Sequence, residues 1–226
     1  MNILAIFMKH PEPGKVKTRL GREIGFDEAA ELYQAFQLDL LESTQRTSDQ
    51  RVIAFSPVAE ASRKYFVEHA NEDDLLWEQP EATLGERLIQ VFDDFLNQDN
   101  RVVVIGSDSP SLPNRLIEEA FRQLETSDIV LGPACDGGYY LVGQRTRCPE
   151  MFNDISWSEP SVLSQTVERI RNAQQSLCLL EPWYDVDSLD DLQMLREHLD
   201  AMRTSNSTEN FPMRTFELTH KLLAEL

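Results

Sequence analysis

The chain has 226 residues, of which 41% are hydrophobic, and it carries a formal net charge of −18 at pH 7. This length suits one large α/β domain, with or without a short tail, and the apolar fraction is enough for a core without disulfides. The acidic balance argues against nucleic acid as a partner, and no stretch approaches the roughly 20 apolar residues of a membrane span. The three cysteines form no CxxC pair, which argues against a disulfide framework and a structural zinc site. The apolar N-terminal segment is too short for a signal peptide, so we expect a cytoplasmic protein.

Strand and helix patterns alternate along the chain. A continuous apolar run predicts a strand over 2–8, and apolar residues with a 3.6 period predict a helix that Asp27 caps and that continues to Leu40. Thr83 and Glu86 form a capping-box pattern at the start of another helix, which we expect to end near Asn97. The other predicted strands are 51–55, 75–78, 101–106, 128–131, 139–143 and 176–180, and the other predicted helices are 59–70, 113–125, 160–173 and 189–202.

This alternation predicts an α/β domain with a mostly parallel central sheet and helices on both faces. We expect the domain to span residues 1–202, and residues 203–226 to form a polar linker and a C-terminal helix. In open sheets of this kind, ligands bind beyond the carboxyl ends of the strands. The loops that follow strands are therefore where we look for site residues.

The loop after the first strand is basic in an acidic chain. Residues 9–22 contain five lysines and arginines against one acid. Gly14 and two prolines turn and stiffen the backbone, and Lys15, Lys17 and Arg19 present cations that suit phosphate oxygens. The loop matches neither the P-loop nor the Rossmann pattern. We interpret it as a phosphate-binding loop, and a solvated basic loop is the alternative.

Two further loops carry an aspartate at the end of a strand. Asp108 directly follows a buried strand, where a carboxylate is a natural ligand of Mg²⁺ or Mn²⁺, although a role in the turn is the alternative. Asp136 precedes Gly137 and Gly138, which allow a ligand to approach the backbone closely. Asp136 is a candidate hydrogen-bond acceptor for a sugar hydroxyl or a candidate base, and the alternative is a simple turn.

Asp185 and Asp187 alternate in the loop before a predicted helix. This pattern suggests one carboxylate in the site and one at the helix cap. The alternative is that Asp187 or Ser188 only caps the helix.

Four motifs follow one another in this order: FMKHPEPGKVKTRL over 7–20, IGSDSP over 105–110, LGPACDGGYYLVG over 131–143 and DVDSLDDL over 185–192. They resemble the GT-A-type glycosyltransferase-like proteins known as arsenosugar-biosynthesis glycosyltransferases, which are related to the molybdenum-cofactor and other nucleotidyltransferases. The resemblance spans most of residues 1–200. It implies a single-domain GT-A fold of the nucleotide-diphospho-sugar transferase type.

The resemblance also implies roles for the candidate residues. These are Gly14, Lys15, Lys17 and Arg19 for the donor phosphates, Asp108 and Asp187 for Mg²⁺ or Mn²⁺, and Asp136 with Gly137, Gly138 and Tyr139 for the sugar or acceptor. An acceptor hydroxyl also needs a general base, and Asp136 is our candidate for this catalytic role. The chain departs from the family in two places. Pro80, Ala82 and Thr83 replace glycines and an aspartate in a loop that would contact the donor base or ribose, and Cys135 stands where relatives often have an acid.

We expect a metal-dependent transfer of a sugar from a nucleotide-sugar donor to a small-molecule acceptor. Nucleotidyl transfer from an NTP to a phosphorylated or cofactor acceptor is the first alternative, but a glycine-rich LxGGxGxR loop would favour it and the first loop lacks that pattern. A non-catalytic nucleotide-binding protein is the second alternative. The presence of Lys17, Arg19, Asp108 and Asp187 together weighs against it.

Overall fold

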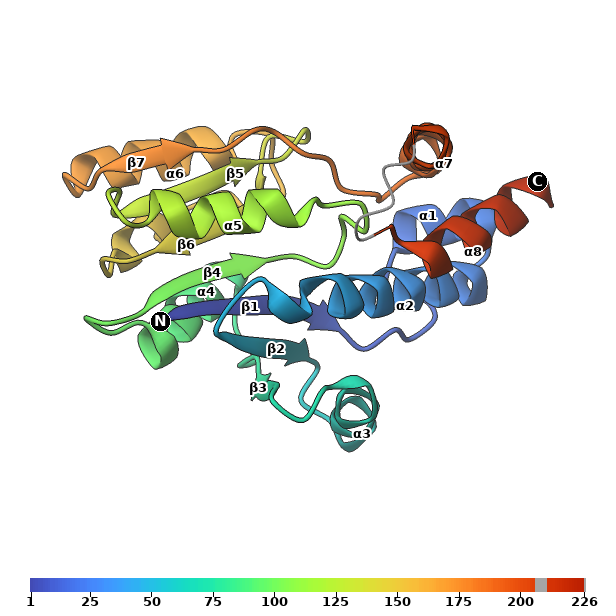
Figure 1. The fold of residues 1–226 in the computed structure, drawn as a ribbon, viewed down its shortest axis with the longest axis horizontal. Helices are drawn as coiled ribbons and strands as arrows, with labels where there is room; N and C mark the ends of the chain where they lie inside the picture. Colours follow the sequence, from blue (N-terminus) through green and yellow to red (C-terminus); the bar gives the residue numbers. More distant parts are fainter. Residues whose placement is uncertain (206–210, 226) are drawn as a thin grey trace.

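A computed structural model describes residues 1–205 and 211–225. Within these residues, seven strands form one sheet in the order β3-β2-β1-β4-β6-β5-β7 (Figure 1). Neighbouring strands run parallel except at β6, which is antiparallel to both β4 and β5. The strands are β1 (Asn2–Lys9), β2 (Gln50–Ser56), β3 (Leu75–Glu78), β4 (Arg101–Ile105), β5 (Ile129–Pro133), β6 (Tyr139–Gln144) and β7 (Leu177–Leu179). The predicted α/β fold with a mostly parallel sheet is confirmed.

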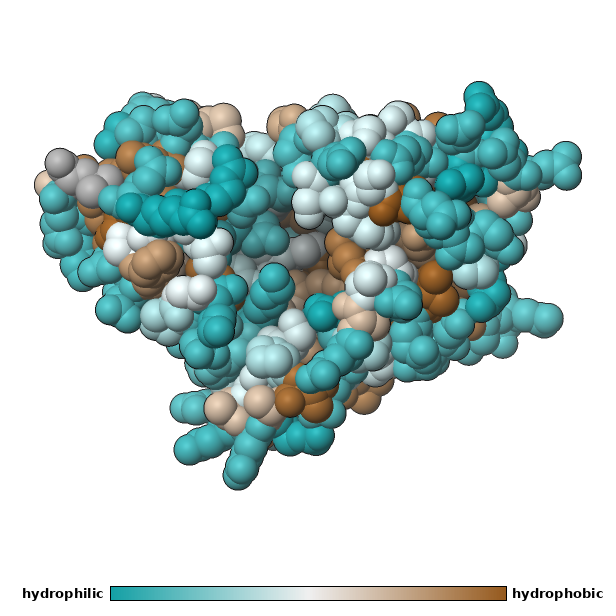
Figure 2. All heavy atoms as spheres, turned by 180° about the vertical axis from the view of Figure 1, so that it is seen from behind, coloured by the Kyte–Doolittle hydropathy of each residue, from teal (hydrophilic) through white to brown (hydrophobic). Residues whose placement is uncertain are grey.

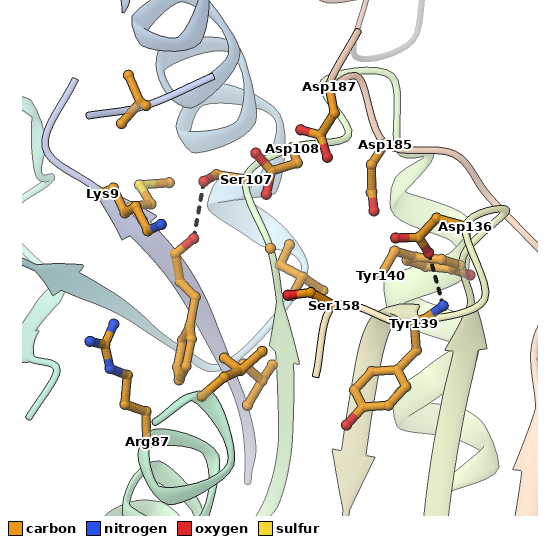
Figure 3. Close-up of a pocket in the computed structure, with 18 of the residues that line it drawn as sticks. Lys9, Arg87, Ser107, Asp108, Asp136, Tyr139, Tyr140, Ser158, Asp185 and Asp187 are labelled. Atoms are coloured by element: carbon orange, nitrogen blue, oxygen red, sulfur yellow. Dashed lines mark hydrogen bonds between the residues drawn. The ribbon is translucent and has the colours of Figure 1, made fainter. Parts of the chain in front are cut away.

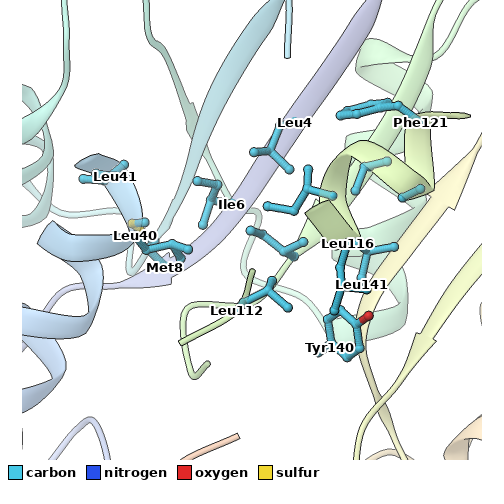
Figure 4. Packing of buried hydrophobic residues seen from close by; sticks show 14 of the residues in the cluster. Leu4, Ile6, Met8, Leu40, Leu41, Leu112, Leu116, Phe121, Tyr140 and Leu141 are labelled. Carbon is cyan, nitrogen blue, oxygen red and sulfur yellow. The ribbon is translucent and has the colours of Figure 1, made fainter. Parts of the chain in front are cut away.

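Helices cover both faces of this sheet, as alternating apolar side chains on the strands require. Leu4 and Ile6 of β1 pack into one core cluster, and Ile3 and Ala5 pack into the other, because successive strand residues point to opposite faces. Figure 4 shows the first cluster, where β1 meets helices α2 and α5. The helices are α1 (Thr18–Ile24), α2 (Phe26–Ser43), α3 (Glu60–His69), α4 (Leu84–Phe95), α5 (Asn114–Gln123), α6 (Val162–Asn172), α7 (Leu189–Thr204) and α8 (Met213–Ala224), with 3₁₀ turns at Thr44–Arg46 and Pro149–Phe152.

Two helix starts differ from the sequence prediction. Asp27 does not cap α2, because Gly25 is the N-cap and Asp27 lies in the first turn, where a carboxylate favours the helix dipole. Helix α1 was not predicted, since seven residues are too few to show an apolar period. The capping box of Thr83 and Glu86 is present at the start of α4.

A third core cluster lies beyond the carboxyl edge of the sheet and joins α1, α2, α7 and α8. Phe216 and Leu222 of α8 pack into it together with Phe36 of α2 and Leu195 of α7. The C-terminal helix is thus part of the packed molecule. Most of the predicted linker, residues 206–210, lies outside the described residues, as does Leu226. None of the helices described is both long enough and apolar enough to cross a membrane.

Candidate active site

A cavity of about 800 Å³ lies at the carboxyl edge of the sheet, where β1, β4 and β5 end. The face drawn in Figure 2 is mainly hydrophilic and is hollowed near its centre. Five cationic and five acidic side chains line the cavity. They are Lys9, Lys15, Lys17, Arg19, Arg87, Asp108, Asp136, Glu159, Asp185 and Asp187.

Lys17 joins the two predicted metal ligands. It lies at the start of α1 in a left-handed conformation, with φ of 44°, and its side chain is 2% exposed. Its Nζ donates to Oδ1 of Asp187 at 2.8 Å and forms a short ion pair with Oδ1 of Asp108. Burial works to lower the pKa of Lys17, but the two carboxylates outweigh it and raise the pKa above its ordinary value. Burial likewise works to raise the pKa of Asp187, but Lys17 holds that pKa below its ordinary value.

The carboxylates of two loops, Asp108 on one and Asp185 and Asp187 on the other, lie side by side (Figure 3). Two hydrogen bonds tie these loops together. The backbone N–H of Val186 donates to the carbonyl of Asp108 at 2.9 Å, which ties the loop before α7 to the end of β4. Ser109 Oγ donates to Oδ1 of Asp185 at 2.5 Å. Burial raises the pKa of Asp185 to about 6, an effect that the Ser109 hydrogen bond partly offsets and the nearby charge of Asp108 reinforces.

The cap of α7 decides between two sequence interpretations. Ser188 caps the helix and forms a capping box with Asp191. Asp185 and Asp187 both line the cavity, so neither is used as the cap. The expectation that one of them would cap the helix was therefore wrong.

Asp136 combines a turn role with a place at the cavity. Its Oδ1 accepts a hydrogen bond from the backbone N–H of Gly138 at 2.8 Å, while the exposed carboxylate faces the cavity. Gly137 has φ of 93°, and a Cβ there would lie 2.2 Å from the carbonyl oxygen of Pro160. Tyr139 also lines the cavity, but its hydroxyl is buried without a partner among the described residues, and burial raises its pKa.

Three of the cations predicted to bind phosphate line the cavity. Lys15 and Arg19 are exposed at its rim, and Lys17 lies deeper, against the carboxylates. Gly14 has φ of 75° and turns the loop, without being one of the residues that line the cavity. Gly137 likewise does not line the cavity, whereas Gly138 does.

Several lining residues were given no role in the sequence analysis, among them Lys9, Arg87, Ser158 and Glu159. Lys9 ends β1, and Arg87 in α4 donates through Nη1 to Oε1 of Gln79 at 3.3 Å. Residues 79–87 depart from the family pattern, so the sequence analysis assigned no ligand contact to this segment. Ser158, in a left-handed conformation with φ of 68°, and Glu159 belong to a segment that follows no strand, so the rule applied to the sequence could not find them.

Asp108 and Asp187 suit a divalent cation whose remaining ligands come from a bound substrate. Lys17 uses only Oδ1 of each carboxylate, and no described residue donates a hydrogen bond to either Oδ2. Mg²⁺ commonly binds one or two carboxylates together with substrate phosphates rather than a cage of protein ligands. No group of three or more His, Cys, Asp or Glu that could hold a metal ion by itself occurs in residues 1–205 and 211–225.

Comparison with known proteins finds a relative that matches nearly the whole chain. The family model that matches residues 40–159 is described as "Uncharacterized protein conserved in bacteria (DUF2064)". A "putative nucleotide-diphospho-sugar transferase" from Desulfovibrio desulfuricans G20 is 35% identical, with a TM-score of 0.85, and the match covers 98% of this chain and 97% of that chain. No curated protein matches this sequence.

More distant structures share the fold alone. A nucleotidyl transferase from Methanothermobacter thermautotroptrophicus is 11% identical with a TM-score of 0.56, and the match covers 87% of this chain and 96% of that chain. CMP:2-keto-3-deoxy-manno-octonic acid synthetase in complex with CTP is 12% identical with a TM-score of 0.51, over 88% of this chain and 98% of that chain. The predicted nucleotide-diphospho-sugar transferase fold is thereby confirmed.

Proposed function

Since this chain belongs to the DUF2064 family of proteins conserved in bacteria, we propose that it is a transferase that moves a sugar from a nucleotide-diphosphate donor to a small acceptor. The name of the Desulfovibrio relative, which matches nearly the full length, supports this proposal. The observation that carries it is the combination of cationic side chains and paired carboxylates in one cavity. A cavity of about 800 Å³ has room for a nucleotide-sugar, since ligand pockets commonly measure about 300–1,000 Å³.

The first step is binding of the donor diphosphate. Lys15 and Arg19 are exposed at the rim, so their charges reach the diphosphate oxygens without breaking an ion pair among the described residues. When the bond between the sugar carbon and the diphosphate breaks, the leaving oxygen takes the electron pair. The two cations stabilise the negative charge that develops there.

The second step is the attack of the acceptor hydroxyl, which needs a general base. Asp136 takes the proton of the acceptor hydroxyl as the acceptor oxygen forms its bond to the sugar carbon. The hydrogen bond from the N–H of Gly138 holds the carboxylate in place at the cavity. Asp108 and Asp187 would hold Mg²⁺ or Mn²⁺, and such an ion would supply Lewis-acid stabilisation of the charge on the diphosphate.

A thermal-shift screen tests the proposal without knowledge of the acceptor. The ligands are NTPs and UDP-, GDP-, CDP- and dTDP-sugars, each with and without Mn²⁺ or Mg²⁺. A ligand that binds only the folded state raises Tm. When its free concentration is a hundred times Kd, it stabilises the folded state by about 2.7 kcal/mol. We expect a metal-dependent shift with nucleotide-sugars. A shift confined to NTPs would point to nucleotidyl transfer, and no shift with any ligand would contradict both.

The same screen applied to Asp108→Ala tests the metal ligand. We expect the variant to lose the metal-dependent part of the shift. Each shift is measured from the variant's own Tm without ligand, because Asp108 pairs with the buried ammonium of Lys17 and its loss lowers that Tm. Asp190→Ala is the matched control, since Asp190 is an exposed carboxylate in the first turn of α7 and does not line the cavity. Calorimetry that finds the same Mn²⁺-dependent nucleotide affinity in Asp108→Ala and wild type would reject the assignment.

A further inference from the structure

The charges that line the cavity are separated along the chain and, except for Lys17, which pairs with Asp108 and Asp187, also in space. All five cations come from residues 9–87, that is from β1, the first loop, α1 and α4, and all five acids come from residues 108–187. Figure 3 shows Lys9 and Arg87 on one side of the cavity and Asp136 and Asp185 on the other. The cavity therefore has a cationic half and an acidic half.

The acidic charges differ in how the protein neutralises them. Asp108 and Asp187 share the ammonium group of Lys17. Asp136 and Glu159 are exposed, and no lysine, arginine or histidine of the described residues forms an ion pair with either one. The acidic half thus presents negative charge that is left for a ligand to meet.

The two loops that carry these carboxylates are fixed to each other. The backbone N–H of Leu163 donates to the carbonyl of Gly137 at 2.9 Å, and Gly137 packs directly on the carbonyl of Pro160. Asp136 precedes this contact on one loop, and Glu159 precedes it on the other. Both carboxylates line the same cavity, so a ligand bound there meets the charge of Glu159 as well as that of Asp136.

We propose that the acceptor is a hydroxyl compound that carries no phosphate or carboxylate group, and that Glu159, together with Asp136, selects against anionic acceptors. This inference rests on the proposed function, because it takes the cationic half as the place of the donor diphosphate. Like charges brought together at an interface are strongly unfavourable, which makes a second phosphate in the acidic half costly. A neutral or cationic hydroxyl compound meets no such repulsion.

Matched acceptor pairs test the inference. Release of nucleoside diphosphate from UDP-, GDP-, CDP- and dTDP-glucose with Mn²⁺ is measured with glycerol against glycerol 3-phosphate and with glucose against glucose 6-phosphate. Mass spectrometry identifies what is transferred. We expect the phosphate-free member of each pair to be used at least about tenfold better, the ratio expected for roughly 1.4 kcal/mol of repulsion between partly screened charges.

Glu159→Lys reverses the charge at the selecting position. We expect this variant to narrow the preference within each pair about tenfold, and Glu159→Gln to narrow it by less. Glu168→Lys is the control, because it changes the net charge by the same amount. Glu168 is an exposed residue of α6 that does not line the cavity.

The outcomes separate this inference from the proposed function. Sugar transfer with an equal or greater use of the phosphorylated members overturns the inference and leaves the sugar transferase in place. Nucleoside diphosphate release that no acceptor accelerates is hydrolysis of the donor, and it overturns both the inference and the proposed transfer. An unchanged preference in Glu159→Lys removes Glu159 from the selection. Release of pyrophosphate from NTPs, or no cleavage of any nucleotide-sugar, overturns the proposed function itself.

Discussion

At the scale of single residues, Lys17 is the side chain with the most unusual surroundings. Its buried ammonium lies between two carboxylates that are each about half exposed, and it also lies 5.6 Å from the ring centre of Tyr33. A divalent cation and Lys17 therefore compete for the same two negative charges. We predict that Lys17→Gln binds Mn²⁺ without nucleotide about tenfold more tightly than wild type, because the paired carboxylates lose their internal cation. Its affinity for the nucleotide should fall.

Lys15→Gln provides the comparison for this prediction. Lys15 is an exposed cation of the same loop that lines the cavity but has no ion pair among the described residues. We expect it to lower nucleotide affinity without raising Mn²⁺ affinity. Titration followed by electron paramagnetic resonance of free Mn²⁺ measures both variants. Equal or weaker Mn²⁺ binding in Lys17→Gln would show that the two cations do not compete.

Gly137 tests how tightly the two acidic loops are joined. Its φ of 93° is unfavourable for any residue with a side chain, and an alanine Cβ would lie 2.2 Å from the carbonyl oxygen of Pro160. We predict that Gly137→Ala lowers the free energy of unfolding by about 2–4 kcal/mol, from strain and a backbone clash together. Urea denaturation measures the change.

Gly14→Ala separates the two contributions. Gly14 also has a positive φ, of 75°, but a Cβ there meets nothing within 4 Å. We expect it to lose only about 1 kcal/mol, the cost of the backbone conformation alone. Equal losses of unfolding free energy in the two variants would mean that the loops near Pro160 separate easily. Asp136 and Glu159 would then not be held together at the cavity.

At the scale of helices and strands, apolar runs predicted every strand that the structure describes to within two residues at each end. Such runs carry a clear signal because parallel strands are buried on both faces. They carry no signal for direction, so the antiparallel β6 could not be read from the sequence.

The site could be predicted only in part for a related reason. The loops after β1, β4 and β5 supplied Lys17, Asp108 and Asp136, which the structure brings to one cavity. The ion pairs of Lys17 depend on the fold, since 170 residues separate it from Asp187. Glu159 reaches the cavity through packing of its loop on Gly137, a contact with no local sequence pattern.

Asp128 links β5 to the ends of its two neighbouring strands. It accepts hydrogen bonds from Ser176 Oγ at 2.5 Å and Ser176 N–H at 3.0 Å, before β7, and from Thr146 Oγ1 at 2.8 Å, after β6. Burial works to raise the pKa of Asp128, but these hydrogen bonds outweigh it and lower the pKa to about 2. A carboxylate with a lowered pKa stabilises the folded state above its unfolded pKa of about 3.9, and this contribution is lost as the pH falls toward 2.

We therefore predict that Asp128→Asn is about 1–2 kcal/mol less stable than wild type at pH 7, after allowance for the partial exposure of the carboxylate. By pH 3 the difference should shrink to about half. Urea denaturation at pH 7, 5 and 3 measures it. Asp73→Asn is the control, because Asp73 is exposed and its side chain has no partner among the described residues. A difference that stays constant with pH would mean that Asp128 acts through packing and not through its charge.

At the scale of the whole molecule, α8 returns to the N-terminal half of the chain and packs on α2. Asp39 of α2, whose side chain is 4% exposed, accepts hydrogen bonds from the backbone N–H groups of Arg214 at 3.3 Å and Thr215 at 2.8 Å. It also pairs with Nη1 of Arg214 at 3.0 Å. The carboxylate thus caps a helix that begins 174 residues later in the chain.

The same helix α2 supports the site from behind. Tyr33 accepts a hydrogen bond from the backbone N–H of Lys9 at 3.1 Å, and its hydroxyl lies 2.6 Å from Oγ of Ser107. A loss of α8 would therefore loosen the helix that joins the ends of β1 and β4. Helix α2 therefore connects the cap of α8, through Asp39, with the site, through Tyr33.

We predict that Asp39→Ala lowers the free energy of unfolding by about 2–4 kcal/mol, because it leaves first-turn N–H groups of α8 without a buried acceptor. Glu42→Ala is the matched control. Glu42 pairs with the same Nη1 of Arg214 at 2.6 Å, but its side chain is 67% exposed, and such a pair contributes less than about 1 kcal/mol. Urea denaturation gives the stability, and hydrogen exchange of the α8 amides gives the place of the loss. If both variants lose equally little, apolar contacts of Phe216 and Leu222 hold α8 without the cap, and α2 keeps its position at the site independently of the C-terminus.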